Sequence, residues 1–563
     1  MTTDTAALRV EHTPASQRPR WPRRLLDPRH RLTLVLLAVS VCVGVLGPLA
    51  LSWRTGSLHI PHNDSWAFSR SAEIFARTGH IRLFNWNAMS LMGAFVPLGP
   101  LARTIASQQC TIAVLSVLSL AAAFDVLRAV IGPRRAAVGL LFLAIWPGFG
   151  LLSTSLMTDI PAFAATTLTL AVGRRAIERG SVRLFALCGL FGLWGFMIRE
   201  QTIAALLAIL GAALLQPRLR TRRMLISYGA LAVPLGIAAG VFELWRRALP
   251  NGSSPTFSQI SYPGTKAVIE TSLGGALLLG LMVSPLVFLA ARPTRWSSIA
   301  VRCSLATFIV TAGMVHWYGV RFPQNYLLIQ GSYTTAFLGS RANVIPHRAW
   351  SLLLPLACVS TALLVGLLIE RLRRIPAELS LFLVITVLGT LMEVVEGEIL
   401  FDRYVFPAML PVLALVLIEP MQLRRRSRVR VGFAATVAVF LGVITSLLTA
   451  NALSFDAAVW HTAQHLVDSG AASAQHVDAG LDWDGLYSPD GAQDTADPNA
   501  IYGIYSKAAE LGHGEPCYVV AASPQNTELD YFTLVRTVKY DKYGVPGRVA
   551  KLWVYRTYQQ SCH

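Results

Sequence analysis

Long apolar runs recur along the chain, and they constrain its fold more than any other feature of the sequence. Runs of about 18 to 22 residues, each long enough to cross a bilayer as a helix, follow one another from Leu32 to Ala450. The composition is 53% hydrophobic and only 14% charged. This balance is not that of a soluble globular protein, so the sequence predicts a polytopic α-helical membrane protein.

Arginine clusters between the apolar runs predict how the helices are oriented. The formal net charge of +18 does not indicate nucleic-acid binding, because the basic residues lie in short clusters and not along one surface. Cytoplasmic loops are enriched in Arg and Lys, so the helix ends that carry the clusters are assigned to the cytoplasm. The clusters span residues 18–31, 128–135, 174–183, 218–223, 292–302, 371–374 and 424–430.

The apolar runs separated by these clusters predict about thirteen transmembrane helices. An odd number of crossings places the N-terminal tail, residues 1–31, in the cytoplasm and the C-terminal segment, residues 452–563, outside it. The membrane domain covers residues 32–451 and includes a long first outer loop at residues 53–104. The predicted helices are 32–52, 105–126, 137–155, 161–177, 183–198, 202–215, 224–243, 271–291, 303–320, 350–369, 377–395, 404–420 and 431–451.

Lysine is rare beside arginine in this chain, which is typical of a GC-rich bacterial genome. We therefore expect the protein in the cytoplasmic membrane of a bacterium, where it contributes to the cell envelope.

The C-terminal segment has a different pattern from the rest of the chain. An Asp/Gly/Ser-rich stretch at residues 478–497 is followed by strand-like runs at residues 517–522, 532–540 and 550–558. This pattern predicts a small extracytoplasmic α+β domain. Cys517 and Cys562 are the two cysteines outside the apolar runs, and we predict a disulfide between them because their compartment is oxidising.

The first outer loop contains an acidic residue before a predicted interfacial helix. Residues 65–78 place polar and apolar side chains on opposite faces, and Gly79 is a typical helix end. The helix would present Asp64 at the lipid surface, although Asp64 can also serve only as its N-cap. Trp66 and Trp86 belong to the same loop, where each can stack on a sugar or anchor the chain in the membrane.

Three histidines share this loop and raise the question of a metal site. His59, His62 and His80 could ligate a divalent cation, but their spacing fits no familiar zinc pattern. We therefore assign no metal to the chain.

Charged residues also occur at three other predicted outer helix ends. Asp159 begins the fourth predicted helix, where an acid and a proline favour any helix start, but a carboxylate at an apolar boundary usually has a partner. Arg199 can snorkel and pair with Glu200, or it can bind a phosphate through two parallel hydrogen bonds. Arg403 and Tyr404 open a late helix. Charged groups from three outer ends are expected where a lipid phosphate meets a hydroxyl acceptor.

Taken in order, these features resemble the GT-C superfamily of glycosyltransferases, and within it the ArnT/PMT-like families 39 and 83. The resemblance rests on the acid before an aromatic-containing helix in the first loop, on Asp159, and on the segment from Arg403 to Pro407, which reads Arg-Tyr-x-x-Pro. Family members often carry two adjacent acids in the first loop, whereas this chain has Asn63 followed by Asp64.

The resemblance implies a sugar donor carried on a polyprenyl phosphate and a hydroxyl acceptor on a lipid, a glycan or a protein. Asp64 would be the catalytic base, with inversion at the anomeric carbon, and Asp159 would orient the acceptor or an arginine. Arg199 and Arg403 would bind the donor phosphate. The other substrate-binding residues would be Trp66, Trp86, Glu200 and Tyr404. No nucleotide-binding loop is visible, and no cofactor is expected.

Two other functions remain open at this point. A transporter or lipid flippase also needs many helices, but its charged groups tend to lie near the middle of the membrane. A polymer ligase with a diphosphate-linked lipid donor would need more basic groups around the phosphates. The position of the charged residues at outer helix ends favours an interfacial transferase.

Overall fold

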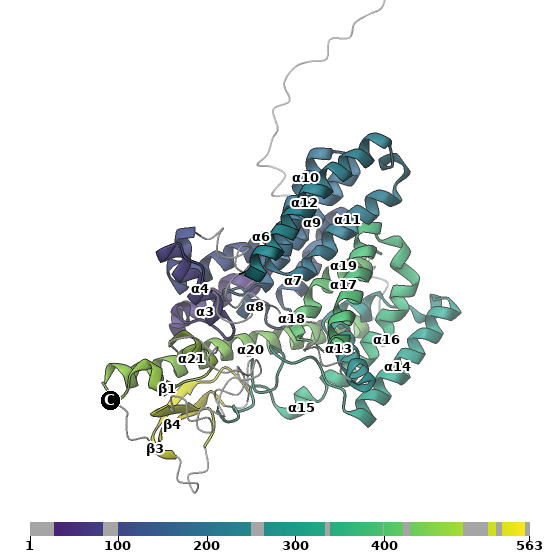
Figure 1. The fold of residues 1–563 in the computed structure, drawn as a ribbon. Coiled ribbons are helices and arrows are strands. Elements are labelled where there is room, and N and C mark those ends of the chain that lie inside the picture. Colours follow the sequence, from purple (N-terminus) through teal and green to yellow (C-terminus); the bar gives the residue numbers. More distant parts are fainter. Residues whose placement is uncertain are drawn as a thin grey trace, which may run out of the picture.

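The structure is a computed structural model, and it describes residues 28–82, 99–248, 264–332, 338–397, 399–419, 428–487, 516–524, 532–545 and 547–557. Its larger part is a helical bundle, and its C-terminal part is a small sheet beside a short helix (Figure 1). The expected polytopic helical fold with a small C-terminal α+β unit is therefore confirmed.

The bundle is built from long apolar helices, as the sequence predicts. The helices that precede the C-terminal unit are α2 (Pro28–Val41), α3 (Gly47–Thr55), α4 (Ser65–Thr78), α6 (Ile105–Ile131), α7 (Pro133–Ala144), α8 (Phe149–Leu152), α9 (Asp159–Arg179), α10 (Val182–Ile198), α11 (Ile203–Leu215), α12 (Arg222–Ala248), α13 (Thr265–Ala290), α14 (Ser298–Tyr318), α15 (His347–Trp350), α16 (Leu353–Arg371), α17 (Ala377–Val395), α18 (Asp402–Val405), α19 (Met409–Leu417) and α20 (Arg428–Asp468).

Within the described ranges, 8 helices are long and apolar enough to cross a membrane, and α10 and α11 are shorter apolar helices. Each of these coincides with an expected crossing. The three other expected crossings fall on α7 with α8, on α9, and on α18 with α19. The chain is thus a multi-pass membrane protein.

The run at residues 137–155, predicted as one helix, is interrupted after Ala144. Pro147 has no amide hydrogen, and Gly148 adopts a left-handed φ of 81°. A Cβ on Gly148 would lie 2.3 Å from Cγ of Tyr326, so the backbone passes directly over that ring. The interruption gives the segments that carry the site a close approach that a continuous helix would prevent.

An aromatic cluster fixes the start of α19 against this interruption. The ring of Phe406 lies 4.4 Å from that of Phe163 in α9 and 5.6 Å from that of Phe149 in α8, measured between centroids. Edge-on and tilted ring pairs of this kind stabilise contacts beyond the burial of their area. The cluster therefore positions α18, the short helix just before Phe406, next to the start of α9.

Helix α20 connects the bundle to the C-terminal unit. It has 41 residues and contains no proline, so it continues past residue 451, where the membrane domain is predicted to end. In Figure 1 the sheet lies beside the end of α20 that is farther from the bundle, together with α21 (Leu481–Tyr487).

The C-terminal sheet has four strands in the order β1-β2-β4-β3. The strands β2 (Tyr518–Ala521), β3 (Phe532–Asp541) and β4 (Val549–Thr557) match the three predicted runs, and β4 pairs antiparallel with both β2 and β3. The short β1 (Val477–Asp478) pairs parallel with β2 and was not predicted. Cys517 is disulfide-bonded, while Cys562 lies outside the described residues.

Candidate active site

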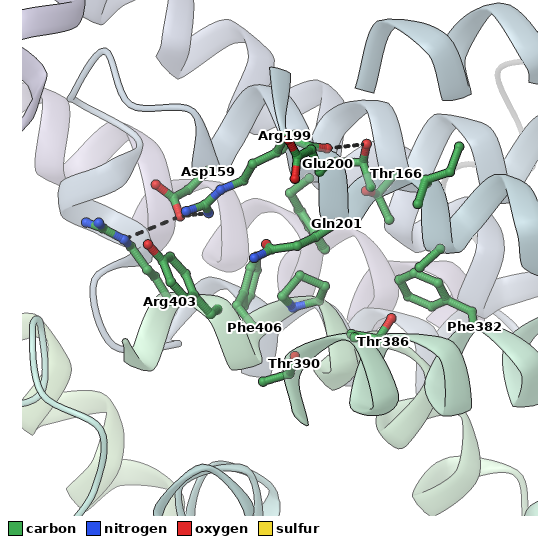
Figure 2. Close-up of a pocket in the computed structure, with 18 of the residues that line it drawn as sticks. Asp159, Thr166, Arg199, Glu200, Gln201, Phe382, Thr386, Thr390, Arg403 and Phe406 are labelled. Carbon is green, nitrogen blue, oxygen red and sulfur yellow. Dashed lines mark hydrogen bonds and ion pairs between the residues drawn. The ribbon is translucent and has the colours of Figure 1, made fainter. Parts of the chain in front are cut away.

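Four charged side chains from three distant parts of the sequence form a chain of ion pairs. Arg403 Nη2 lies 3.2 Å from Asp64 Oδ2, and Arg403 Nε lies 3.7 Å from Asp159 Oδ1. Asp159 Oδ1 in turn accepts a hydrogen bond of 2.5 Å from Arg199 Nη1. Figure 2 shows Asp159 between the two arginines. The structure thus brings together all four residues for which the sequence predicts roles in catalysis or phosphate binding.

Asp64 occupies the N-cap position of α4 but does not cap it. Helix α4 spans Ser65–Thr78 and ends at Gly79, as predicted, yet the Asp64 side chain makes no hydrogen bond to the amides of the first turn. It is 6% exposed and points to Arg403. Burial raises the pKa of the Asp64 carboxyl, and the Arg403 guanidinium opposes part of that rise. Such a carboxyl is suited to accept a proton.

The residue before Arg403, Asp402, anchors this part of the backbone. Asp402 is fully buried, and its Oδ2 accepts hydrogen bonds of 2.7 Å from the backbone amides of Tyr326 and Leu327. No pattern in the sequence indicates this role of Asp402, because its partners lie far away in the chain. Among the described residues, Arg403 Nη1 has no hydrogen-bond partner, so the guanidinium keeps a donor for a further ligand.

Arg199 lies on the other side of Asp159 and stacks on an aromatic ring. It ends α10 in an extended conformation, and its guanidinium carbon lies 4.4 Å from the centroid of the Tyr404 ring. Glu200 does not pair with Arg199, since Arg199 is held by Asp159. Glu200 Oε1 instead lies 3.9 Å from Arg246 Nη2, and the Glu200 side chain is 62% exposed.

The two tryptophans of the first loop, Trp66 and Trp86, are predicted sugar contacts. Trp66 is 1% exposed, and its ring lies against Gly485 of α21, where a Cβ would come within 2.2 Å of it. The expected stacking of Trp66 on a sugar is therefore not supported, because protein covers the ring. Trp86 lies outside the described residues.

A pocket opens beside the charged chain and extends between α9, α11 and α17. Its volume is about 1040 Å³ including the open mouth. Asp159, Arg199 and Arg403 lie at one end, and Phe382 lies at the other (Figure 2). Between them the wall is mostly apolar, with hydroxyl groups from Thr166, Thr386 and Thr390 and aliphatic residues such as Ile160, Ile203 and Ile385.

One face of α17 forms the length of this pocket. The lining residues of α17 run from Phe382 to Glu393 at helical spacing, which corresponds to about 16 Å along the helix axis. At the mouth, Gln201 Nε2 donates a hydrogen bond to Glu393 Oε1 and joins the segment after α10 to α17. The arrangement suits an amphiphile with an anionic head at the arginines and an apolar tail along α17.

The histidines of the first loop do not form a metal centre in the part of the chain that is described. No group of three or more His, Cys, Asp or Glu side chains there is arranged to hold a metal ion. His62 Nδ1 instead lies 2.7 Å from Asp456 Oδ2 in α20, and His59 and His80 are exposed.

A family model for dolichyl-phosphate-mannose-protein mannosyltransferases matches residues 104–242. This segment contains Asp159 and Arg199 but neither Asp64 nor Arg403. The expected resemblance to the GT-C superfamily, of the ArnT/PMT-like type, is confirmed. A membrane glycosyltransferase is the activity that this match supports.

Other comparisons are more distant. Crystal structures of ArnT from Cupriavidus metallidurans, in the apo state and bound to undecaprenyl phosphate, are 14% identical to this chain, with TM-scores of 0.36 and 0.38. They cover 93% and 92% of this chain and 97% of their own. No curated protein matches the sequence.

Proposed function

We propose that this protein transfers a sugar from a polyprenyl-phosphate donor to a hydroxyl acceptor at the outer face of the cytoplasmic membrane, with inversion of the anomeric carbon. The observation that carries the proposal is the chain of ion pairs from Asp64 through Arg403 and Asp159 to Arg199, at the polar end of an apolar pocket. The acceptor is a lipid, a glycan or a protein.

The pocket supports an anionic polyprenyl lipid as donor. Arg403 Nη1, which has no hydrogen-bond partner in the described parts of the chain, and the guanidinium of Arg199 would bind the phosphate, since arginine recognises phosphate oxygens through directed hydrogen bonds. The apolar wall along α17 would cover the first isoprene units. Two arginines line the described pocket, which favours a monophosphate over the diphosphate of a polymer ligase.

The reaction would proceed by direct displacement. Asp64 takes the proton of the acceptor hydroxyl while its oxygen attacks the anomeric carbon, and the bond from that carbon to the phosphate oxygen breaks. The polyprenyl phosphate leaves with the bonding electrons, and Arg403 and Arg199 stabilise the added negative charge. Attack opposite to the phosphate inverts the anomeric configuration. No cofactor enters this scheme.

The remaining candidate residues have supporting roles in this proposal. Asp159 contacts both arginines and would orient them toward the phosphate. The Tyr404 ring stacks on the Arg199 guanidinium and would also contact the sugar, and Glu200, which lines the pocket, would bind a sugar hydroxyl. Trp86 is kept as a candidate sugar contact from the first loop.

The charges favour a transferase over a transporter or flippase. Asp159 starts α9, Arg199 ends α10 and Arg403 lies in α18 just before α19, so the groups lie at helix ends and not in helix centres, where transporters tend to bind their substrates. The arginine clusters between the helices support a cytoplasmic N-terminus, which would place these ends and the C-terminal domain outside.

Lipid binding provides a direct test of the donor. The full-length protein in nanodiscs is analysed by native mass spectrometry with undecaprenyl phosphate and, as a matched control, with undecaprenol. We expect a complex with the phosphate form only, and a loss of that complex in Arg199→Gln/Arg403→Gln. Equal binding of both lipids, or unchanged binding by the double variant, would contradict the proposed donor site.

A further inference from the structure

The loop that precedes α4 contains a non-glycine residue in the left-handed backbone conformation. Asn63 has a φ of 51°, and among the described residues it is the only non-glycine residue with a positive φ. Asparagine tolerates this left-handed conformation better than most residues. The turn is closed by two hydrogen bonds, from the His62 amide to Ser65 Oγ at 2.7 Å and from the Ser65 amide to the His62 oxygen at 3.1 Å.

Two buried carboxylates from other parts of the chain hold this loop. Asp456 of α20 is 3% exposed and accepts a hydrogen bond of 2.7 Å from His62 Nδ1. Asp482 of α21 is 6% exposed, and the Asn63 backbone opposes part of the rise that burial causes in the pKa of its carboxyl, so this carboxyl faces the loop at Asn63. The loop is therefore fixed at His62 by Asp456 and faced at Asn63 by Asp482, immediately before Asp64.

Helix α21, which carries Asp482, packs against α4. Arg70 Nη1 donates a hydrogen bond of 2.9 Å to the oxygen of Gly485 in α21, and Trp66 packs against the same glycine. On the other side of α21, the ring of Trp483 lies 4.8 Å from that of Trp460 in α20. Helix α21 is thus clamped between α4 and α20, and the C-terminal domain contributes directly to the surroundings of the site.

The side chain of an aspartate at the N-cap position usually accepts a hydrogen bond from a backbone amide in the first turn of its helix. Asp64 does not do so, and its carboxylate reaches Arg403 instead. For the Asp64 carboxylate to face Arg403, the backbone of the loop must keep it away from the amides of the first turn of α4. The hydrogen bonds of His62, together with the packing of α21 on α4, supply that constraint.

We propose that Asp482 and the His62–Asp456 pair are positioning residues, which hold the loop at residues 62–65 so that Asp64 faces Arg403 and the donor phosphate. The proposal rests on the proposed function, because it takes Asp64 as the base. It assigns to the C-terminal domain a part in catalysis, through the backbone of Asn63. It also assigns His62 a role through Nδ1 alone.

A different role for His62 is the main competing explanation. His62 Nε2 is buried and has no hydrogen-bond partner among the described residues, so it could act as an acid, a base or a metal ligand. The two roles predict different behaviour of conservative variants. In His62→Asn the amide nitrogen takes the place of Nδ1 and still donates to Asp456, but nothing replaces Nε2.

The experiment compares disruptive and conservative variants of the full-length protein in nanodiscs. Asp482→Ala removes the carboxyl that faces Asn63 and His62→Ala removes the hydrogen bond to Asp456, whereas Asp482→Asn keeps an oxygen acceptor and His62→Asn keeps a donor. Asp468→Ala, which removes an exposed carboxylate at the end of α20, is the control. Sugar transfer gives kcat and KM, and hydrogen–deuterium exchange is measured for peptides covering residues 60–70.

For both alanine variants we expect kcat to fall by about 10- to 100-fold, with KM for the donor little changed and faster exchange in residues 60–70. The asparagine variants and Asp468→Ala should remain close to the unmodified protein in both measurements. Normal kcat and normal exchange in Asp482→Ala would overturn the proposal, and so would a His62→Asn variant as impaired as His62→Ala. Absence of transfer by the unmodified protein would overturn the proposed function, while the exchange data would still decide whether the loop is held as proposed.

Discussion

Asp64 and Arg403 are separated by 339 positions in the sequence, and Arg403 Nη2 lies 3.2 Å from Asp64 Oδ2 in the folded chain. The contact joins the first loop to the start of α18. It places the candidate base next to the candidate phosphate ligand, so that one guanidinium contacts the group that accepts the proton and is free to contact the leaving group.

Replacement of Asp64 by asparagine should abolish most transfer without unfolding the protein. Because the side chain makes no capping hydrogen bond, its loss should leave α4 intact, while the rate falls by at least about 100-fold. Transfer assays and thermal melting of the same preparation would measure both effects. Near-normal transfer by Asp64→Asn would exclude Asp64 as the base.

Arg403→Lys should impair transfer more severely than Arg199→Lys. Lysine keeps the charge but cannot contact Asp64, Asp159 and a phosphate together, so we expect a loss of roughly 100-fold for Arg403→Lys. Arg199 has one acidic partner and a more exposed side chain, 20% against 5%, so its loss should be smaller. Parallel measurement of kcat for the two variants tests the order, and a reversed order would make Arg199 the principal phosphate ligand.

A methyl group added to Gly485 should destabilise the contact between α21 and α4. Its Cβ would lie 2.2 Å from the Trp66 ring, and overpacking of this kind costs about 1 to 3 kcal/mol. Gly432→Ala in α20 is the matched control, since no atom lies within 4 Å of that Cβ and alanine favours a helix. Melting curves should show a lower Tm for the first variant only.

The buried acids of the C-terminal domain should make stability depend on pH. Burial raises the pKa of Asp478 to about 6, and burial together with Asp478 raises the pKa of Asp484 well above its ordinary value. The folded state therefore binds more protons than the unfolded state, so this contribution is present below about pH 4 and is lost as the pH rises through about 6.

Asp484→Asn should weaken this dependence. Its amide can donate to the Asp478 carboxylate, which then ionises without a neighbouring acid. We expect the fall in Tm between pH 5 and pH 8 to be smaller than in the unmodified protein. An identical fall in both proteins would show that the pair does not control it.

The orientation can be tested by labelling single cysteines in intact cells with an impermeant maleimide. Arg77, whose side chain is 63% exposed in α4, should be labelled when changed to cysteine, and Arg220→Cys, in an arginine cluster, should not. The unmodified chain controls for its own cysteines. Labelling at position 220 with protection at position 77 would reverse the topology.

The sequence predicts which parts of the chain carry the site but not which residues touch. Hydrophobic run length and arginine clusters predict outer helix ends for Asp159, Arg199 and Arg403 and the first outer loop for Asp64. The local pattern suggested Glu200 as the partner of Arg199, whereas the fold provides Asp159, 40 positions away. Pairing across the bundle depends on helix packing, which periodicity does not encode.

The same limit applies to the supporting residues. Asp402, Asp456 and Asp482 are buried acids whose partners come from distant segments, and no spacing rule connects them. Tryptophan is a residue type typical of membrane-interface anchors, and only the fold shows that α21 covers the Trp66 ring. The hydropathy of residues 137–155 predicts one helix, because run length alone does not register the break that Pro147 and Gly148 cause.

The length of α20 has a mechanical consequence. An unbroken helix of 41 residues extends for about 60 Å, and without proline it has no sharp bend of its own. Helix α20 therefore joins the bundle to the C-terminal domain as one continuous helix. An acceptor cannot gain entry by a swing of that domain about its connection to the bundle, so the approach to Asp64 must open through movement of segments other than α20.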